Sequence, residues 1–109
     1  MGHFCFQNTF YKLDVNSYHG NGGDALTSSA PNNGMAFSTH DQDHDKWSSS
    51  CVNGYGGGGW WFNKCGYTNL NGYNYGHAKI SSESMNWYKF GNTRESLKTI
   101  TMAIRPIEI

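Results

Sequence analysis

Apolar and polar side chains alternate in two places, near the start and near the end of the chain. Residues 11–15 (Tyr-Lys-Leu-Asp-Val) alternate ahead of a glycine-rich stretch at 18–23, which predicts a strand that runs into a turn. Residues 97–105 alternate over a longer range and end at Pro106, as a half-buried strand does. The second stretch is the clearest strand pattern in the sequence.

The region between these stretches has little regular pattern. Asp24 precedes Ala25 and Leu26 and predicts the cap of a short helix, and residues 35–39 predict a brief extended segment. Residues 51–79 are mostly Gly, Asn, Tyr and Trp, without the periodic apolar positions of a long helix or a regular sheet. We therefore expect low helix content and a folded but irregular central loop.

Composition explains how such a loop could be ordered. The 109 residues suffice for one domain or part of one, and they include 14 Gly, 4 Trp, 7 Tyr and 6 Phe with few aliphatic residues. Aromatic rings, tight turns and a covalent or metal staple must then supply the order.

Charge excludes some partners. Eight Lys and Arg balance eight Asp and Glu without a local basic cluster, so nucleic acid is not an expected partner. No apolar run approaches the roughly 18 residues needed to cross a bilayer, so membrane insertion is not expected. Residues 1–5 do not form a signal peptide, and an export signal would lie outside this chain.

Three carboxylates at alternate positions, Asp41, Asp43 and Asp45, predict a loop that turns hard oxygen ligands toward Ca²⁺. The loop is not an EF-hand, because Lys46 stands at its sixth position and Val52 at its twelfth. On spacing alone, a solvated turn explains the cluster equally well.

A zinc site made of His40, Asp41 and His44 is a weaker alternative, because no Cys or His pair with zinc-finger spacing follows. Enzymatic motifs are also missing from the sequence, including Gly-x-Ser-x-Gly and His-Glu-x-x-His. The chain is therefore not expected to be an enzyme.

Cys51 and Cys65 enclose a glycine- and tryptophan-rich loop. Closing a loop of about 15 residues stabilises a protein by roughly 3 kcal/mol, and a disulfide implies an oxidising compartment. Cys5 is left over; it could pair with a partner chain, pair with a segment of the same protein that this sequence lacks, or stay a buried thiol, and we favour the second. The glycines at 56–59 precede Trp60 and not a Lys-Ser/Thr pair, so we expect backbone packed against indole rather than a phosphate cradle.

Several segments, taken in order from about Tyr11 to Pro106, resemble the fibrinogen C-terminal domain family. They are 23–26 (GDAL), 33–39 (NGMAFST), 41–45 (DQDHD), Cys51, 59–61 (GWW), 63–65 (NKC), 69–72 (NLNG), 86–87 (NW) and 101–106 (TMAIRP). The resemblance implies an α+β fold of short antiparallel strands, short helices and long irregular loops stabilised by calcium and a disulfide.

The resemblance also implies that residues 1–109 form a partial domain. They would comprise part of the central sheet subdomain and the calcium- and ligand-binding subdomain. The resemblance implies that the first subdomain of the family, with its own disulfide, would lie outside this sequence. On the same resemblance, residues 1–10 are expected to be a divergent or artificial start.

Carried over residue by residue, the resemblance implies a Ca²⁺ cofactor held by the carboxylates of Asp43 and Asp45 and the carbonyls of Trp47 and Ser49. Asp41 would be a nearby supporting carboxylate. The resemblance further implies a disulfide between Cys51 and Cys65.

A ligand pocket beside the calcium loop is also implied. Its residues here are Tyr55, Lys64, Cys65, Gly66, Ser81, Ser82 and Thr93. Many acetyl-binding lectins of the family have a cis peptide just before the second cysteine, which corresponds to Lys64–Cys65 in this chain.

The function implied is that of a secreted, calcium-dependent recognition module that binds acetylated glycans in innate immunity, like a ficolin or a tachylectin. The alternative is a protein- or peptide-binding module of a matrix, clotting or receptor-ligand protein. Gly66, Ser81, Ser82 and Thr93 depart from the residues common in the acetyl-binding relatives. The full-length protein is expected to be an extracellular homo-oligomer, because family members gain avidity by multimerising.

Overall fold

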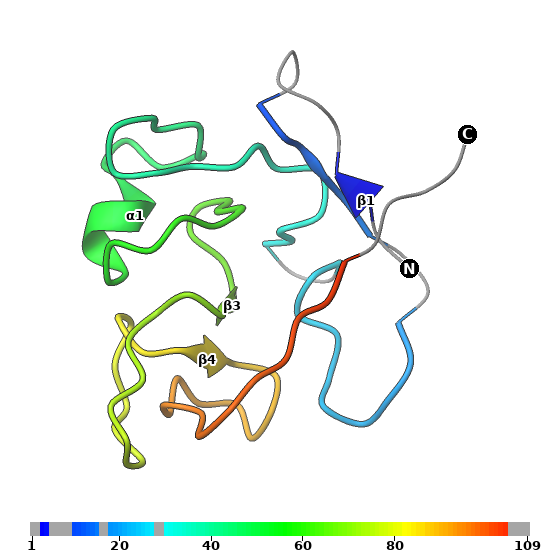
Figure 1. The fold of residues 1–109 in the computed structure, drawn as a ribbon, viewed down its shortest axis with the longest axis vertical. Coiled ribbons are helices and arrows are strands. Elements are labelled where there is room, and N and C mark those ends of the chain that lie inside the picture. Colours follow the sequence, from blue (N-terminus) through cyan, green and yellow to red (C-terminus); the bar gives the residue numbers. More distant parts are fainter. Residues whose placement is uncertain (1–2, 5–9, 16–17, 28–29, 105–109) are drawn as a thin grey trace.

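The computed structural model describes residues 3–4, 10–15, 18–27 and 30–104 (Figure 1). Its regular elements are short: two pairs of strands and one helical turn. They are β1 (His3–Phe4), β2 (Leu13–Asp14), α1 (Cys51–Gly54), β3 (Thr68–Asn69) and β4 (Asn86–Trp87). The expected α+β class, with short antiparallel strands and long irregular segments, is confirmed.

Each pair of strands forms a separate antiparallel sheet. Strand β1 pairs with β2, with His3 opposite Asp14, and β3 pairs with β4, with Thr68 opposite Trp87. Figure 1 shows α1 and the β3–β4 pair on one side of the molecule and β1–β2 on the other. None of the described helices is long and apolar enough to cross a membrane.

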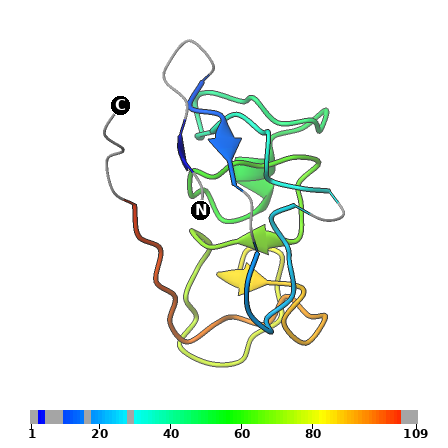
Figure 2. The same cartoon turned by 90° about the vertical axis from the view of Figure 1, so that its right-hand side faces the viewer.

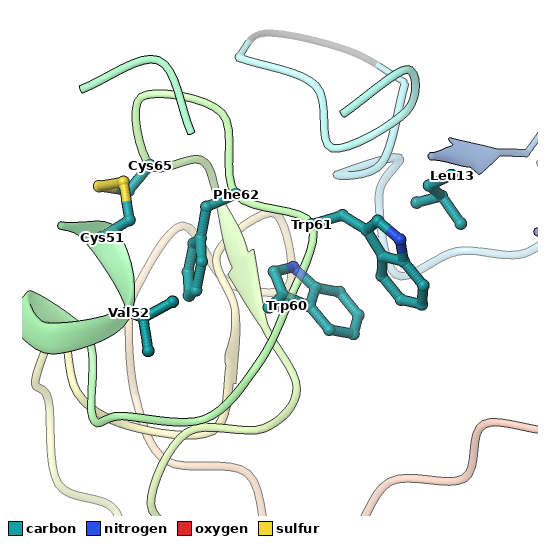
Figure 3. Close-up of a cluster of buried hydrophobic side chains, with 7 residues drawn as sticks. All are labelled: Leu13, Cys51, Val52, Trp60, Trp61, Phe62 and Cys65. Carbon is teal, nitrogen blue, oxygen red and sulfur yellow. A yellow bond between two sulfur atoms is a disulfide. The ribbon is translucent and has the colours of Figure 1, made fainter. Parts of the chain in front are cut away.

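The core lies between these groups and is built from the disulfide loop (Figure 3). Its side chains come from β2, from α1 and from the segment between Trp60 and Cys65: Leu13, Cys51, Val52, Trp60, Trp61, Phe62 and Cys65. The rings of Trp60 and Trp61 meet edge to face, with their centroids 5.1 Å apart. Aromatic rings therefore supply the burial that aliphatic layers provide in most small domains.

Buried asparagines hold the irregular segments together. Asn32 donates from Nδ2 to the carbonyl of Trp61 at 2.8 Å, and Asn69 donates to the carbonyl of Tyr55 at 2.7 Å. Asn86 donates to the carbonyl of Ser84 at 2.8 Å. All three side chains are buried. Their amide groups satisfy buried carbonyls, a role that strand pairing fills in a regular sheet.

The first predicted strand is confirmed in shortened form, since β2 covers two residues of the predicted 11–15. The helix expected at Asp24 is wrong. Asp24 Oδ1 accepts from the backbone N–H groups of Leu26 and Thr27, at 3.1 and 3.0 Å, and this caps a turn that does not continue as a helix. Within the predicted irregular loop, residues 51–54 form the helical turn α1, whose cap Ser50 accepts from the N–H of Asn53.

The C-terminal strand expected at 97–105 is also wrong over its described part. Residues 97–104 carry no strand pairing, and Met102 and Ile104 are 45% and 71% exposed. Figure 2 shows this segment running along one side of the molecule. Alternation gives a strand only where a neighbouring strand shares its backbone hydrogen bonds. The Leu97 N–H donates to the carbonyl of Met85, but beyond Leu97 the described residues make no backbone–backbone hydrogen bond to this segment. Arg105 and Pro106 lie outside the described residues, as does Cys5.

The glycine-rich run at 56–59 packs closely, although not against an indole as expected. A Cβ at Gly59 would lie 2.8 Å from the ring of Phe37, and one at Gly58 would collide with the carbonyl of Asn71. The glycines therefore admit a neighbouring ring and a neighbouring backbone segment.

Candidate functional site

The acidic loop is ordered by hydrogen bonds to its own carboxylates. Asp43 Oδ1 accepts from the N–H of Asp45 at 3.1 Å, and Asp45 Oδ1 accepts from the N–H of Trp47 at 2.9 Å. Asp45 Oδ2 accepts from the N–H of Cys51 at 2.8 Å. Asp45 therefore joins the acidic loop to the disulfide and to the start of α1.

The electrostatics of the pair suit a cation. Burial raises the pKa of Asp45, the N–H groups of Cys51 and Trp47 oppose that rise, and the nearby carboxylate of Asp43 adds to it. The carbonyls of Trp47 and Ser49 accept no backbone hydrogen bond from the described residues. Two carboxylates that repel each other and two carbonyls without a backbone partner are donors of the type that Ca²⁺ prefers, so the residue types present fit this ion.

The contacts of Asp41 are with other residues than Asp43 and Asp45. Its Oδ1 accepts from the Thr39 hydroxyl at 2.8 Å and lies 3.7 Å from His40 Nδ1. The Thr39 hydrogen bond lowers the pKa of Asp41. The ring of His44 stacks on Phe10 with centroids 4.1 Å apart, and no group of three His, Cys, Asp or Glu able to hold a metal occurs among the described residues. The zinc alternative therefore gains no support.

The disulfide between Cys51 and Cys65 is present, with Cα atoms 5.5 Å apart. The predicted pairing is confirmed. The N–H of Lys46 donates to the carbonyl of Asn63 at 2.9 Å, so the acidic loop is also tied to the segment just before Cys65. The acidic loop and the segment that leads to the expected pocket are thus linked by a backbone hydrogen bond.

Three of the expected ligand residues meet at a residue that sequence reasoning missed. The guanidinium of Arg94 lies over the ring of Tyr55, 5.6 Å from its centroid, and Nη2 donates to the carbonyl of Gly66 at 3.2 Å. The carbonyl of Arg94 accepts from the N–H of Ser81 at 3.3 Å. Arg94 follows the expected Thr93 directly, but nothing in the sequence pattern distinguishes it as the centre of the cluster.

The other expected residues lie differently. Lys64 is exposed, Cys65 is buried in the disulfide, and Ser82 is half-buried beside Ser81. Thr93 lines a cavity of about 550 Å³ together with residues from 76–78 and 95–98, away from the contacts of Arg94 with Tyr55 and Gly66. The cis peptide expected at Lys64–Cys65 is wrong, because that bond is trans.

Gly66 has a backbone reason to be glycine. Its φ of +119° is a conformation that side-chain-bearing residues rarely adopt, and a Cβ there would lie 3.2 Å from Asn32 Nδ2. The departure of Gly66 from the residues common in the acetyl-binding relatives therefore accompanies a backbone that only glycine accommodates without strain.

Comparisons with known proteins place this arrangement in a family. The family described as fibrinogen beta and gamma chains, C-terminal globular domain, matches residues 3–107. The chain belongs to this family. The fibrinogen alpha chain of Gallus gallus is 42% identical to it over an alignment of 115 positions, which covers 90% of this chain and 15% of the relative.

Solved members of the family have the same fold. The fibrinogen-like globe domain of human ANGPTL2 superposes with a TM-score of 0.77 and 37% identity, over 89% of this chain and 44% of that one. A lamprey fibrin D-dimer complexed with the peptide ligand Gly-His-Arg-Pro-amide superposes with a TM-score of 0.78 and 26% identity, over 89% and 36%. The chain thus spans less than half the length of each of these relatives.

These relatives bear on the choice between the two expected functions. They are fibrinogen and angiopoietin-related proteins, and one of them carries a peptide. They favour the protein- or peptide-binding alternative over the lectin-like interpretation and give no support to an acetylated glycan or to a role in innate immunity.

Proposed function

We propose that this chain is the ligand-binding part of a fibrinogen-like domain and binds a protein or peptide outside the cell, without catalysing a reaction. The observation that carries the proposal is the convergence of Tyr55, Gly66 and Ser81, from three separate segments, on Arg94. The peptide bound in the related lamprey structure supports the choice of ligand class. The disulfide supports an oxidising, extracellular location.

The same proposal includes Ca²⁺ as a structural cofactor. Asp43, Asp45 and the carbonyls of Trp47 and Ser49 would hold the ion, which would neutralise the two carboxylates. Because Asp45 also accepts from Cys51 N–H, neutralisation would stabilise the start of α1, which leads to Tyr55.

Calcium dependence is tested by thermal unfolding in Ca²⁺ and in EDTA. At a Ca²⁺ concentration 100-fold above Kd, the native chain should be stabilised by about 2.7 kcal/mol. Asp43→Asn should lose most of this stabilisation. Asp41→Asn is the matched control and should keep it, because Asp41 bonds to Thr39 and not to the Asp43–Asp45 pair. Equal melting temperatures of the native chain with and without Ca²⁺ would refute the metal site.

Ligand class is tested by presenting the labelled chain to an extracellular protein and peptide array and to a glycan array, each with Ca²⁺ and with EDTA. Calcium-dependent retention on proteins or peptides supports the proposal. Retention confined to acetylated sugars would overturn it in favour of the lectin-like interpretation.

A further inference from the structure

Three tyrosines surround the guanidinium of Arg94. Its distance to the ring centroids is 5.6 Å for Tyr55, 5.9 Å for Tyr67 and 5.5 Å for Tyr88. All three are within the range in which aromatic faces attract a cation, and several faces around one cation make an aromatic cage. We call Tyr55, Tyr67 and Tyr88 the tyrosine cage.

The walls of the tyrosine cage are held by contacts that do not involve Arg94. The rings of Tyr67 and Tyr88 lie 5.1 Å apart, and the N–H of Tyr88 donates to the carbonyl of Tyr67 at 2.7 Å. The ring of Tyr55 lies 5.9 Å from Phe62, and its carbonyl accepts from Asn69 at 2.7 Å. The cage should therefore persist when its occupant leaves.

Arg94 is an imperfect occupant. Its Nη2 donates to the carbonyl of Gly66, but Nη1 is buried without a hydrogen-bond partner. No carboxylate of the described residues lies within ion-pair distance of the guanidinium. A buried charged donor without a partner is costly, so the occupied state is poorly satisfied and displaceable.

The backbone of Arg94 is anchored independently of its side chain. Its carbonyl accepts from the Ser81 N–H and from the Ser84 hydroxyl, at 3.3 and 2.5 Å. The side chain can therefore leave the cage by rotating about its own bonds while the backbone stays in place.

We propose that the tyrosine cage is a cation-binding subsite of the ligand surface and that Arg94 is its internal occupant. A ligand that carries a guanidinium group binds there by displacing the Arg94 side chain. Arg94 thus gates the site and sets its specificity for ligands able to compete with an arginine. This inference rests on the proposed function only for the identity of the natural ligand.

The first test uses ethylguanidinium as the probe and neutral ethylurea, of similar shape, as its control. Calcium-loaded native chain, Arg94→Ala and Lys89→Ala are titrated with each probe by NMR. We expect Arg94→Ala to bind ethylguanidinium at least tenfold more tightly than the native chain and to bind ethylurea no better. Lys89→Ala removes a cation that also lies over Tyr67, at 5.6 Å, but leaves the cage filled, so it should behave as the native chain does.

Two outcomes would overturn the inference. Ethylguanidinium could bind Arg94→Ala and the native chain equally, or ethylurea could bind Arg94→Ala as tightly as ethylguanidinium, which would indicate a void and not a cation site. If Arg94→Ala fails to fold, the native chain itself supplies the test. The Arg94 Nε–H resonance should move toward that of an exposed arginine when N-acetyl-arginine methylamide is added, and a resonance that stays in place at saturation would contradict displacement.

Failure of this inference is distinguishable from failure of the proposed function. A protein partner that binds the native chain, Arg94→Ala and Tyr67→Ala with equal affinity would remove the cage from the ligand surface and leave the binding function intact. If Arg94→Ala binds ethylguanidinium but the chain is retained on no protein array, the cage would stand as a cation site and the proposed binding function would fail.

Discussion

The disulfide-linked region and the C-terminal segment differ in what orders them. Residues 38–66 contain almost no regular secondary structure, yet Trp60 and Phe62 are each only 1% exposed there. Residues 97–104 have the clearest alternating pattern in the sequence, yet they form no strand and Ile104 is 71% exposed. The alternating pattern and the burial of side chains thus run in opposite directions in these two regions.

The reason lies in the partners that each region finds. The first region is closed by the Cys51–Cys65 bridge, and Ser38 exchanges backbone hydrogen bonds with Trp60, at 2.9 and 3.1 Å. In the C-terminal segment, the described hydrogen bonds to the backbone stop early, with the Leu97 N–H donating to Met85 and the Lys98 carbonyl accepting from Asn74. Bonds between segments distant in sequence therefore decide which stretch is buried.

The largest effect should come from one truncation made in each region. Phe62→Ala should destabilise the chain by about 3–5 kcal/mol, because it leaves a cavity beside Val52 and the tryptophans. Ile104→Ala should change stability by less than about 0.5 kcal/mol, because the side chain is mostly in water. Urea unfolding followed by tryptophan fluorescence measures both. Similar losses for the two variants would show that the C-terminal segment is packed in solution.

Opening the disulfide should have the next largest effect. Cys51→Ser together with Cys65→Ser should lower the free energy of unfolding by roughly 3 kcal/mol, because it releases the closed loop in the unfolded chain. Calorimetry of this variant against Cys5→Ser, which leaves the bridge intact, isolates the contribution of the bridge. An unchanged melting temperature would mean that the aromatic core alone orders residues 51–65.

The smallest effect should come from a single hydroxyl. Thr68 is buried and donates from Oγ1 to the carbonyl of Asn86 at 3.0 Å across the β3–β4 pair. Thr68→Val should cost about 1 kcal/mol, because it leaves that buried carbonyl with one partner fewer. Thr99→Val, at an exposed position of the unpaired segment, should be within about 0.5 kcal/mol of the native chain. Chemical denaturation distinguishes the two, and equal costs would mean that the hydroxyl of Thr68 contributes nothing specific.

The candidate site could be predicted from the residues only where the groups that act together are close in sequence. Asp43 and Asp45 are two residues apart, so their oxygens were predicted to act together. Burial raises the pKa of Asp45, and the carboxylate of Asp43 adds to that rise. Tyr55 and Ser81 come from segments 26 positions apart, and the resemblance to a family placed them near each other. Arg94 could not be foreseen, because its importance comes from three rings on three different segments.

The sequence by itself determined which groups stabilise the fold: an aromatic core, glycines at close contacts, a disulfide and a pair of carboxylates. These properties follow from side-chain chemistry and short spacing, which do not depend on how the chain folds back. Only the tertiary structure decided that residues 97–104 stay unpaired, that Gly66 needs a positive φ, and that Arg94 fills the tyrosine cage. Each of these depends on which distant backbone or ring lies opposite, and that is fixed only when the whole chain has packed.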